Sequence, residues 1–93
     1  MRALTSDVFC AGYLILRGAA LVDLIVDNDG HRQTGTFVLE GPEAIASQEE
    51  YSRGDAQARV KPLRDAVSSL RAELARALRG QPFKARHNAN VSR

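Results

Sequence analysis

Side chains that commonly bind metal ions are few in this chain, and they lie far apart along it. The sequence contains one cysteine, Cys10, and two histidines, His31 and His87. A zinc site takes three or four such ligands, usually including pairs that are close in sequence. We therefore predict no metal site, and we interpret His31 as a solvated turn residue and Cys10 as a small buried hydrophobic side chain.

Acidic and hydroxyl side chains also lack the spacing that calcium binding or catalysis requires. Asp23, Asp27 and Asp29 do not follow the alternating positions of an EF-hand loop, and a turn accounts for them better. Glu49 and Glu50 are adjacent on an expected helix, where neighbouring side chains point apart. No histidine lies in an expected helix or strand, where it could act as a base for serine, and no glycine-rich phosphate loop is present. We expect no catalytic residue and no cofactor, and hence not an enzyme.

Charge is divided unevenly along the chain, and this division is the clearest sign of a partner. The first 58 residues carry four basic and nine acidic side chains, a net of −5. The last 35 carry nine basic and two acidic side chains, a net of +7. Clustered Arg and Lys attract phosphate groups or an acidic protein surface over about 8 to 10 Å in physiological salt. The C-terminal third is therefore the expected contact region.

The basic residues of this region fall into a helical stripe and a tail. Arg64, Arg71 and Arg79 are seven and eight residues apart, which is close to whole turns of an α-helix. The candidate binding residues are Arg64, Arg71, Arg76, Arg79, Phe83, Lys84 and Arg86. In the alternative interpretation, the stripe is only the solvated side of a helix, because Arg favours helices and Asp65 and Glu73 offset part of the charge. Both interpretations stay open for the helix.

The N-terminal segment predicts a helix that needs more than one neighbour. Thr-Ser-Asp at 5–7 offers three successive N-cap candidates, the apolar run 8–16 follows, and Gly18 suits the left-handed position after a helix. Because apolar residues lie on nearly every side of this helix, it must be covered on two faces. We expect a sheet on one face, and a second subunit could cover the other.

Two alternating segments joined by a turn signal predict a β-hairpin. The first segment places Val22, Leu24 and Val26 on one face, and the second alternates in the same way. Asn-Asp-Gly-His between them supplies the positive φ angles that tight hairpin turns use. The predicted segments are 20–27 and 35–40, with the turn at 28–31.

Two further helices are expected in the second half of the chain. Pro42 can begin a short acidic helix that extends to about Arg53. Residues 56–60 then form either a short third strand or a simple crossing. The longest helix begins at Pro62 and ends before Gly80. Its apolar stripe, spaced by three and four residues, consists of Leu63, Val67, Leu70, Leu74 and Leu78.

These elements predict a small two-layer α+β domain. Both longer helices are expected to pack on one face of the sheet. Residues 1–80 form this single domain, and residues 81–93 form a basic tail that we expect to be mobile. A chain of 93 residues with five aromatic side chains has little core, so we expect a homo-oligomer that covers what one copy cannot.

The sequence carries no feature of an exported or membrane protein. The apolar run 8–16 is far shorter than the roughly 20 residues that span a bilayer, and no signal-peptide cleavage pattern follows it. A single cysteine excludes an internal disulfide and fits a reducing compartment. We expect a cytoplasmic protein that does not contact membranes.

The order of these motifs resembles a known domain family. The motifs are Thr-Ser-Asp at 5–7, Arg17-Gly18, Thr-Phe-Val-Leu-Glu at 36–40, Tyr51 with Gly54, and Val60-x-Pro62 before a leucine-rich helix. Together they span about residues 5–78 and resemble DUF5659, a small bacterial and archaeal family. The family's function is unknown, so the resemblance assigns no catalytic residue. This chain departs from the family pattern at Gly35 and Gly41, and we expect these glycines to loosen the edge of the hairpin.

The sequence therefore favours a non-catalytic accessory protein that binds nucleic acid or a nucleoprotein assembly through the phosphate backbone. No helix-turn-helix, zinc-finger or RNA-recognition signature supports base-specific recognition. The alternative is a protein-interaction module, or an oligomeric subunit of a larger complex. Its basic tail would bind an acidic protein surface without touching nucleic acid.

Overall fold

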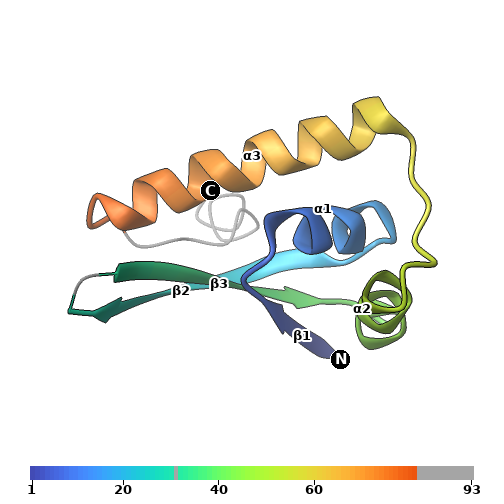
Figure 1. Cartoon of the computed structure of the whole chain (residues 1–93), viewed down its shortest axis with the longest axis horizontal. Coiled ribbons are helices and arrows are strands. Elements are labelled where there is room, and N and C mark those ends of the chain that lie inside the picture. Colours follow the sequence, from blue (N-terminus) through green and yellow to red (C-terminus); the bar gives the residue numbers. More distant parts are fainter. Residues whose placement is uncertain (31, 82–93) are drawn as a thin grey trace, which may run out of the picture.

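The computed structural model describes residues 1–30 and 32–81. The elements are β1 (Arg2–Thr5), α1 (Val8–Leu16), β2 (Ala20–Asp29), β3 (Arg32–Glu40), α2 (Ala44–Ser52) and α3 (Val60–Leu78). They form two layers, with α1 and α3 above one face of an antiparallel sheet and α2 at one end of it (Figure 1). The predicted α+β class, with a long C-terminal helix over a small sheet, is confirmed.

The predicted hairpin is present, but an irregularity changes which side chains face the helices. Strands β2 and β3 pair from Ala20 to Asp29, and the turn uses Gly30 at φ 65°. A register shift between Leu21 and Asp23 places Leu21 opposite Leu39 and Leu24 opposite Phe37. Because such a bulge adds one residue to one strand, Leu21 shares the helix-facing side with Leu24. The regular alternation of the sequence had assigned Val22 to that side.

The third strand lies at the opposite end of the chain from where it was expected. Strand β1 pairs with β3 from Arg2 to Thr5, so the strand order is β1-β3-β2. Of the two alternatives for residues 56–60, the structure has the crossing and not the strand: residues 55–59 are irregular and Val60 begins α3 (Figure 1). Strand β3 pairs with β1 on one side and with β2 on the other. A further strand could therefore join this sheet only at the outer edge of β1 or of β2.

Helix α1 has the predicted bounds, and a single copy of the chain covers it on several sides. Asp7 is the N-cap, and Gly18 follows the helix at φ 99°. Five successive residues, Cys10 to Leu14, are buried. The sheet lies beneath α1, and α3 of the same chain packs on another side of it, where a second subunit was one possible cover (Figure 1).

Helix α3 begins two residues earlier than predicted, and two glycines allow its side chains to approach α1 and β3 closely. Pro62 lies in its first turn, where a missing backbone N–H costs nothing. A Cβ at Gly12 would lie 3.0 Å from Cγ2 of Val67, and a Cβ at Gly35 would overlap the side chain of Leu74. Gly35 therefore makes room for α3.

Candidate functional site

The arginines of α3 do not all lie on one side of the helix. An α-helix advances about 100° per residue, so Arg64 and Arg71 are only about 20° apart around the axis. Around the same axis, Arg79 lies about 80° from Arg71, on the side of Arg64, and Arg76 lies about 140° from Arg71. The predicted stripe is thus a pair, Arg64 and Arg71, which we call the arginine edge, with Arg79 displaced toward the middle of the exposed side.

Ion pairs divide these arginines in the same way. Arg76 Nη2 lies 2.6 Å from Oε2 of Glu73, so its charge is offset on the helix itself. Lys61 is paired with Asp65 at 3.1 Å. Within residues 1–30 and 32–81, the exposed side chains of Arg64, Arg71 and Arg79 make no ion pair. Positive charge is therefore available at the arginine edge and at Arg79, whereas Arg76 is partly neutralised.

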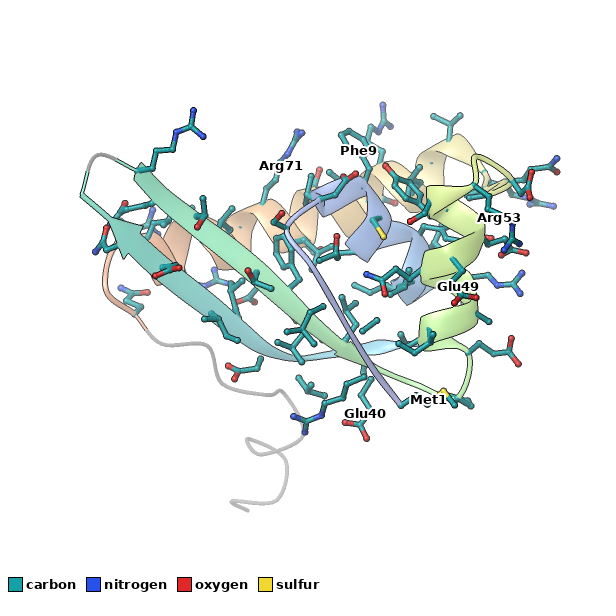
Figure 2. The ribbon with its side chains drawn as sticks, turned by 60° about the horizontal axis from the view of Figure 1, so that its bottom comes forward. Met1, Phe9, Glu40, Glu49, Arg53 and Arg71 are labelled. Carbon is teal, nitrogen blue, oxygen red and sulfur yellow. The ribbon has the colours of Figure 1, made fainter. Side chains whose placement is uncertain are left out.

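An aromatic side chain that the sequence analysis did not select lies beside the arginine edge. Phe9 is in the first turn of α1 and is 46% exposed. The guanidinium carbon of Arg71 lies 5.5 Å from the centroid of its ring, within the range of a cation–π contact. Figure 2 shows Phe9 and Arg71 on the same side of the molecule, one from α1 and one from α3.

Phe9 was missed because its partner is 62 positions away in the sequence. The apolar run 8–16 groups it with Tyr13 and Leu16, and that stripe indicates burial. The available signal for an exposed Phe9 was its position two residues after the Asp7 cap, because the first turn of a helix often lies at the edge of the fold. Asp7 Oδ1 accepts hydrogen bonds from the backbone N–H of Phe9 at 2.9 Å and of Cys10 at 3.4 Å, which orients this turn.

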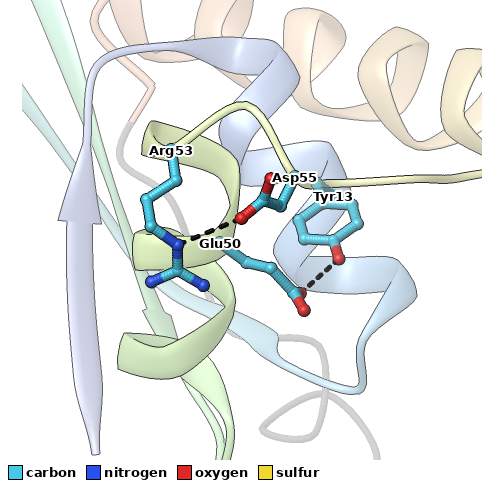
Figure 3. A network of polar contacts seen from close by, with 4 residues as sticks. All are labelled: Tyr13, Glu50, Arg53 and Asp55. Atoms are coloured by element: carbon cyan, nitrogen blue, oxygen red, sulfur yellow. Dashed lines mark hydrogen bonds and ion pairs between the residues drawn. The ribbon is translucent and has the colours of Figure 1, made fainter.

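The acidic side of the molecule is occupied by structural contacts between α1 and α2. The Tyr13 hydroxyl donates to Oε1 of Glu50 at 2.5 Å, and the Tyr51 hydroxyl donates to Oδ2 of Asp7 at 2.9 Å. Figure 3 shows the first of these bonds beside the Arg53–Asp55 ion pair. The bond to Glu50 raises the pKa of Tyr13, and burial raises the pKa of Tyr51. These carboxylates therefore hold helices together.

The single cysteine is enclosed by the core. Cys10 is buried, and burial raises the pKa of its thiol. A raised thiol pKa lowers the thiolate fraction at neutral pH, which is the opposite of what a nucleophile needs. In the part of the chain that the structure describes, no three His, Cys, Asp or Glu side chains cluster closely enough to hold a metal ion.

Three of the predicted binding residues, Phe83, Lys84 and Arg86, lie outside the described residues, as does the tail from residue 82 onward. Gln81, the first residue of the predicted tail, is exposed and irregular. Among the described helices, none combines the length and apolar character that crossing a bilayer demands.

Comparison with known proteins adds no relative. No family model, no curated protein and no solved structure matches this chain significantly. The resemblance to DUF5659 therefore stays a prediction.

Proposed function

We propose that this protein is a non-catalytic accessory protein that binds the phosphate backbone of a nucleic acid with the exposed side of α3. The predicted basic tail would extend the same contact. The observation that carries the proposal is the set of three exposed arginines, Arg64, Arg71 and Arg79, that make no ion pair within the described residues. An arginine side chain without an ion pair can hold a phosphate without first giving up a carboxylate.

Electrostatics supports the direction of this contact. Helix α3 carries five basic and two acidic side chains together with its C-cap, whereas α2 and its flanks are rich in Glu and Asp. The carboxylates of Glu50 and Asp7 already accept hydrogen bonds between α1 and α2, and Glu49 of α2 lies apart from Arg71 (Figure 2). A polyanion approaching the molecule is therefore steered toward α3.

The test is a salt titration of binding to random-sequence oligonucleotides, followed by fluorescence anisotropy. Binding should be measurable at about 50 mM salt and should weaken steeply as salt rises, because each neutralised phosphate releases counterions. Reversing Arg64, Arg71 and Arg79 to Glu should abolish it. A control triple reversal with the same net charge, at Arg2, Arg32 and Arg53, should weaken binding far less.

Two results would overturn the proposal. One is the absence of wild-type binding at low salt. The other is equal loss in the two triple variants, which would mean that net charge matters and the exposed side of α3 does not.

The open face of the sheet favours a second candidate, a protein-interaction module or a subunit of an oligomer. Leu4 and Ile25 lie on the side away from α1 and α3 and are 53% and 46% exposed. In the register Leu4 is opposite Val38, which is buried, and Ile25 is opposite Thr36. Light scattering at tens of micromolar tests this: a dimer mass that Ile25→Arg reduces to a monomer mass supports it, and a monomeric wild type opposes self-association.

A further inference from the structure

Phe9 is the one strongly exposed aromatic side chain among the described residues. Tyr13 and Phe37 are buried and Tyr51 is half-buried, whereas Phe9 keeps 46% of its surface in contact with solvent. Exposing this much aromatic surface forgoes the free energy of burial. A protein with so few aromatic residues gains nothing in stability from leaving one at the rim.

Helices α1 and α3 pack closely at Gly12, one turn along α1 from Phe9. A Cβ at Gly12 would lie 3.0 Å from Cγ2 of Val67 and 3.3 Å from Cδ1 of Leu63, so the two helices approach tightly here. Val67 is buried at this crossing. The Phe9 ring and the Arg71 guanidinium lie outside it, at the rim, and each retains an exposed surface.

We propose that Phe9 and Arg71 form a stacking site for an unpaired base of single-stranded nucleic acid. This inference rests on the proposed function, and it names the form of nucleic acid that the site takes. A planar base can stack on the exposed part of the Phe9 ring, next to the guanidinium that already lies over that ring. In a duplex the base faces are covered by their neighbours, so a duplex can offer the protein only phosphates and groove edges.

The arginine edge gives the strand a direction along α3. Arg64 lies two turns before Arg71 on the same edge, a separation of about 10 Å along the axis. Arg71 borders the stacking site, and Arg64 can hold a phosphate further along the strand. Positive charge on one side of an aromatic ring is the combination that sequence-tolerant single-strand binding proteins use.

The experiment compares Phe9→Leu with the wild-type protein on four ligands of equal length. These are single-stranded DNA, single-stranded RNA, a DNA duplex and a DNA strand whose central nucleotides lack bases. Phe9→Leu keeps an apolar side chain but removes the aromatic face. Stacking of one base is worth about 1–3 kcal/mol, so we expect binding to single strands to weaken by about 5- to 150-fold. Binding to the duplex and to the abasic strand should change by less than about twofold.

Two further variants sharpen the comparison. Ile25→Ala removes apolar surface from a side chain that is also 46% exposed, on the opposite face of the sheet, and should affect the single strands, the duplex and the abasic strand alike. Phe9→Trp keeps an aromatic face and should retain single-strand binding. Circular dichroism melting of each variant shows whether it is folded under the conditions of the assay.

The outcomes separate this inference from the proposed function. The stacking site is overturned if Phe9→Leu and wild type bind single strands with equal affinity. It is also overturned if Phe9→Leu weakens binding to the duplex and the abasic strand as much as binding to single strands. In both cases phosphate binding stands. If wild type binds none of the ligands, the proposed function fails and the inference with it. Preference between the DNA and RNA strands shows which single-stranded nucleic acid the site takes.

Discussion

Replacing Asp7 should destabilise the protein at two places, because its two carboxylate oxygens serve different elements. Oδ1 caps α1 through the backbone N–H groups of Phe9 and Cys10, and Oδ2 accepts the hydroxyl of Tyr51 on α2. Loss of a helix cap costs about 1 kcal/mol. The tyrosine bond is near the surface, so its net worth is also about 1 kcal/mol. Asp7→Ala should therefore lower the free energy of unfolding by about 2 kcal/mol.

The assay is thermal and urea unfolding at neutral pH, followed by circular dichroism. For a domain of this size 1 kcal/mol shifts Tm by about 4–8 °C, so Asp7→Ala should lower Tm by about 10 °C. Asp7→Ser can still cap α1 but is too short to reach Tyr51, and it should lose about half as much. Tyr51→Phe should match Asp7→Ser, and the double variant should be no worse than either one alone.

A local readout accompanies the stability change. The hydrogen bond to Asp7 adds to the effect of burial in raising the pKa of Tyr51, so Asp7→Ser should move that pKa toward its ordinary value of 10.0. Asp55→Ala, at an exposed ion pair with Arg53, is the matched control and should change stability by less than about 1 kcal/mol. If Asp7→Ala shifts Tm by less than about 3 °C, or if Asp7→Ser and Tyr51→Phe are fully additive, Asp7 does not serve both α1 and Tyr51.

Three other predictions concern the core. Because the pKa values of Tyr13 and Tyr51 are raised on folding, their contribution is complete below about pH 10 and is lost as pH rises toward the folded values. Urea unfolding should show stability falling above pH 10, less steeply in Tyr51→Phe; an unchanged slope contradicts this. The Cys10 thiol, buried and with a raised pKa, should react with a disulfide reagent far more slowly in the native protein than in urea. Equal rates would show that the core is open. Gly35→Ala should destabilise the wild-type protein by about 1–3 kcal/mol because the new Cβ overlaps Leu74. In a Leu74→Ala background the same change should be neutral or stabilising, and a cost that persists there would place the strain in the strand itself.

Local signals predicted most helix boundaries and the hairpin. The Asp7 cap and Gly18 bound α1, and Gly30 forms the hairpin turn at positive φ. Each of these residues acts through its own backbone or its nearest neighbours, so its effect is contained in a few consecutive positions. The start of α3 was misplaced by two residues because Pro62 is tolerated throughout the first turn and does not specify one position in it.

Strand β1 and the bulge near Val22 could not be predicted in this way. Arg2–Thr5 is too short to show an alternating pattern, and it becomes a strand because β3 offers an unpaired edge. The bulge exists because Leu21 and Leu24 both have to face the helices, opposite Leu39 and Phe37. Both features depend on which segments meet, and that information is spread over the whole chain.

Sequence patterns alone predict the α+β class, the hairpin, the long amphipathic helix and the division of charge between the first 58 and the last 35 residues. Only the tertiary structure placed Phe9 of α1 beside Arg71 of α3. The pair of Arg76 with Glu73, by contrast, is a local contact within α3 that the spacing of three residues already indicates. The physical reason is distance: helical spacing orders side chains around one axis, but a contact between α1 and α3 is set by how their surfaces pack at Gly12 and Val67.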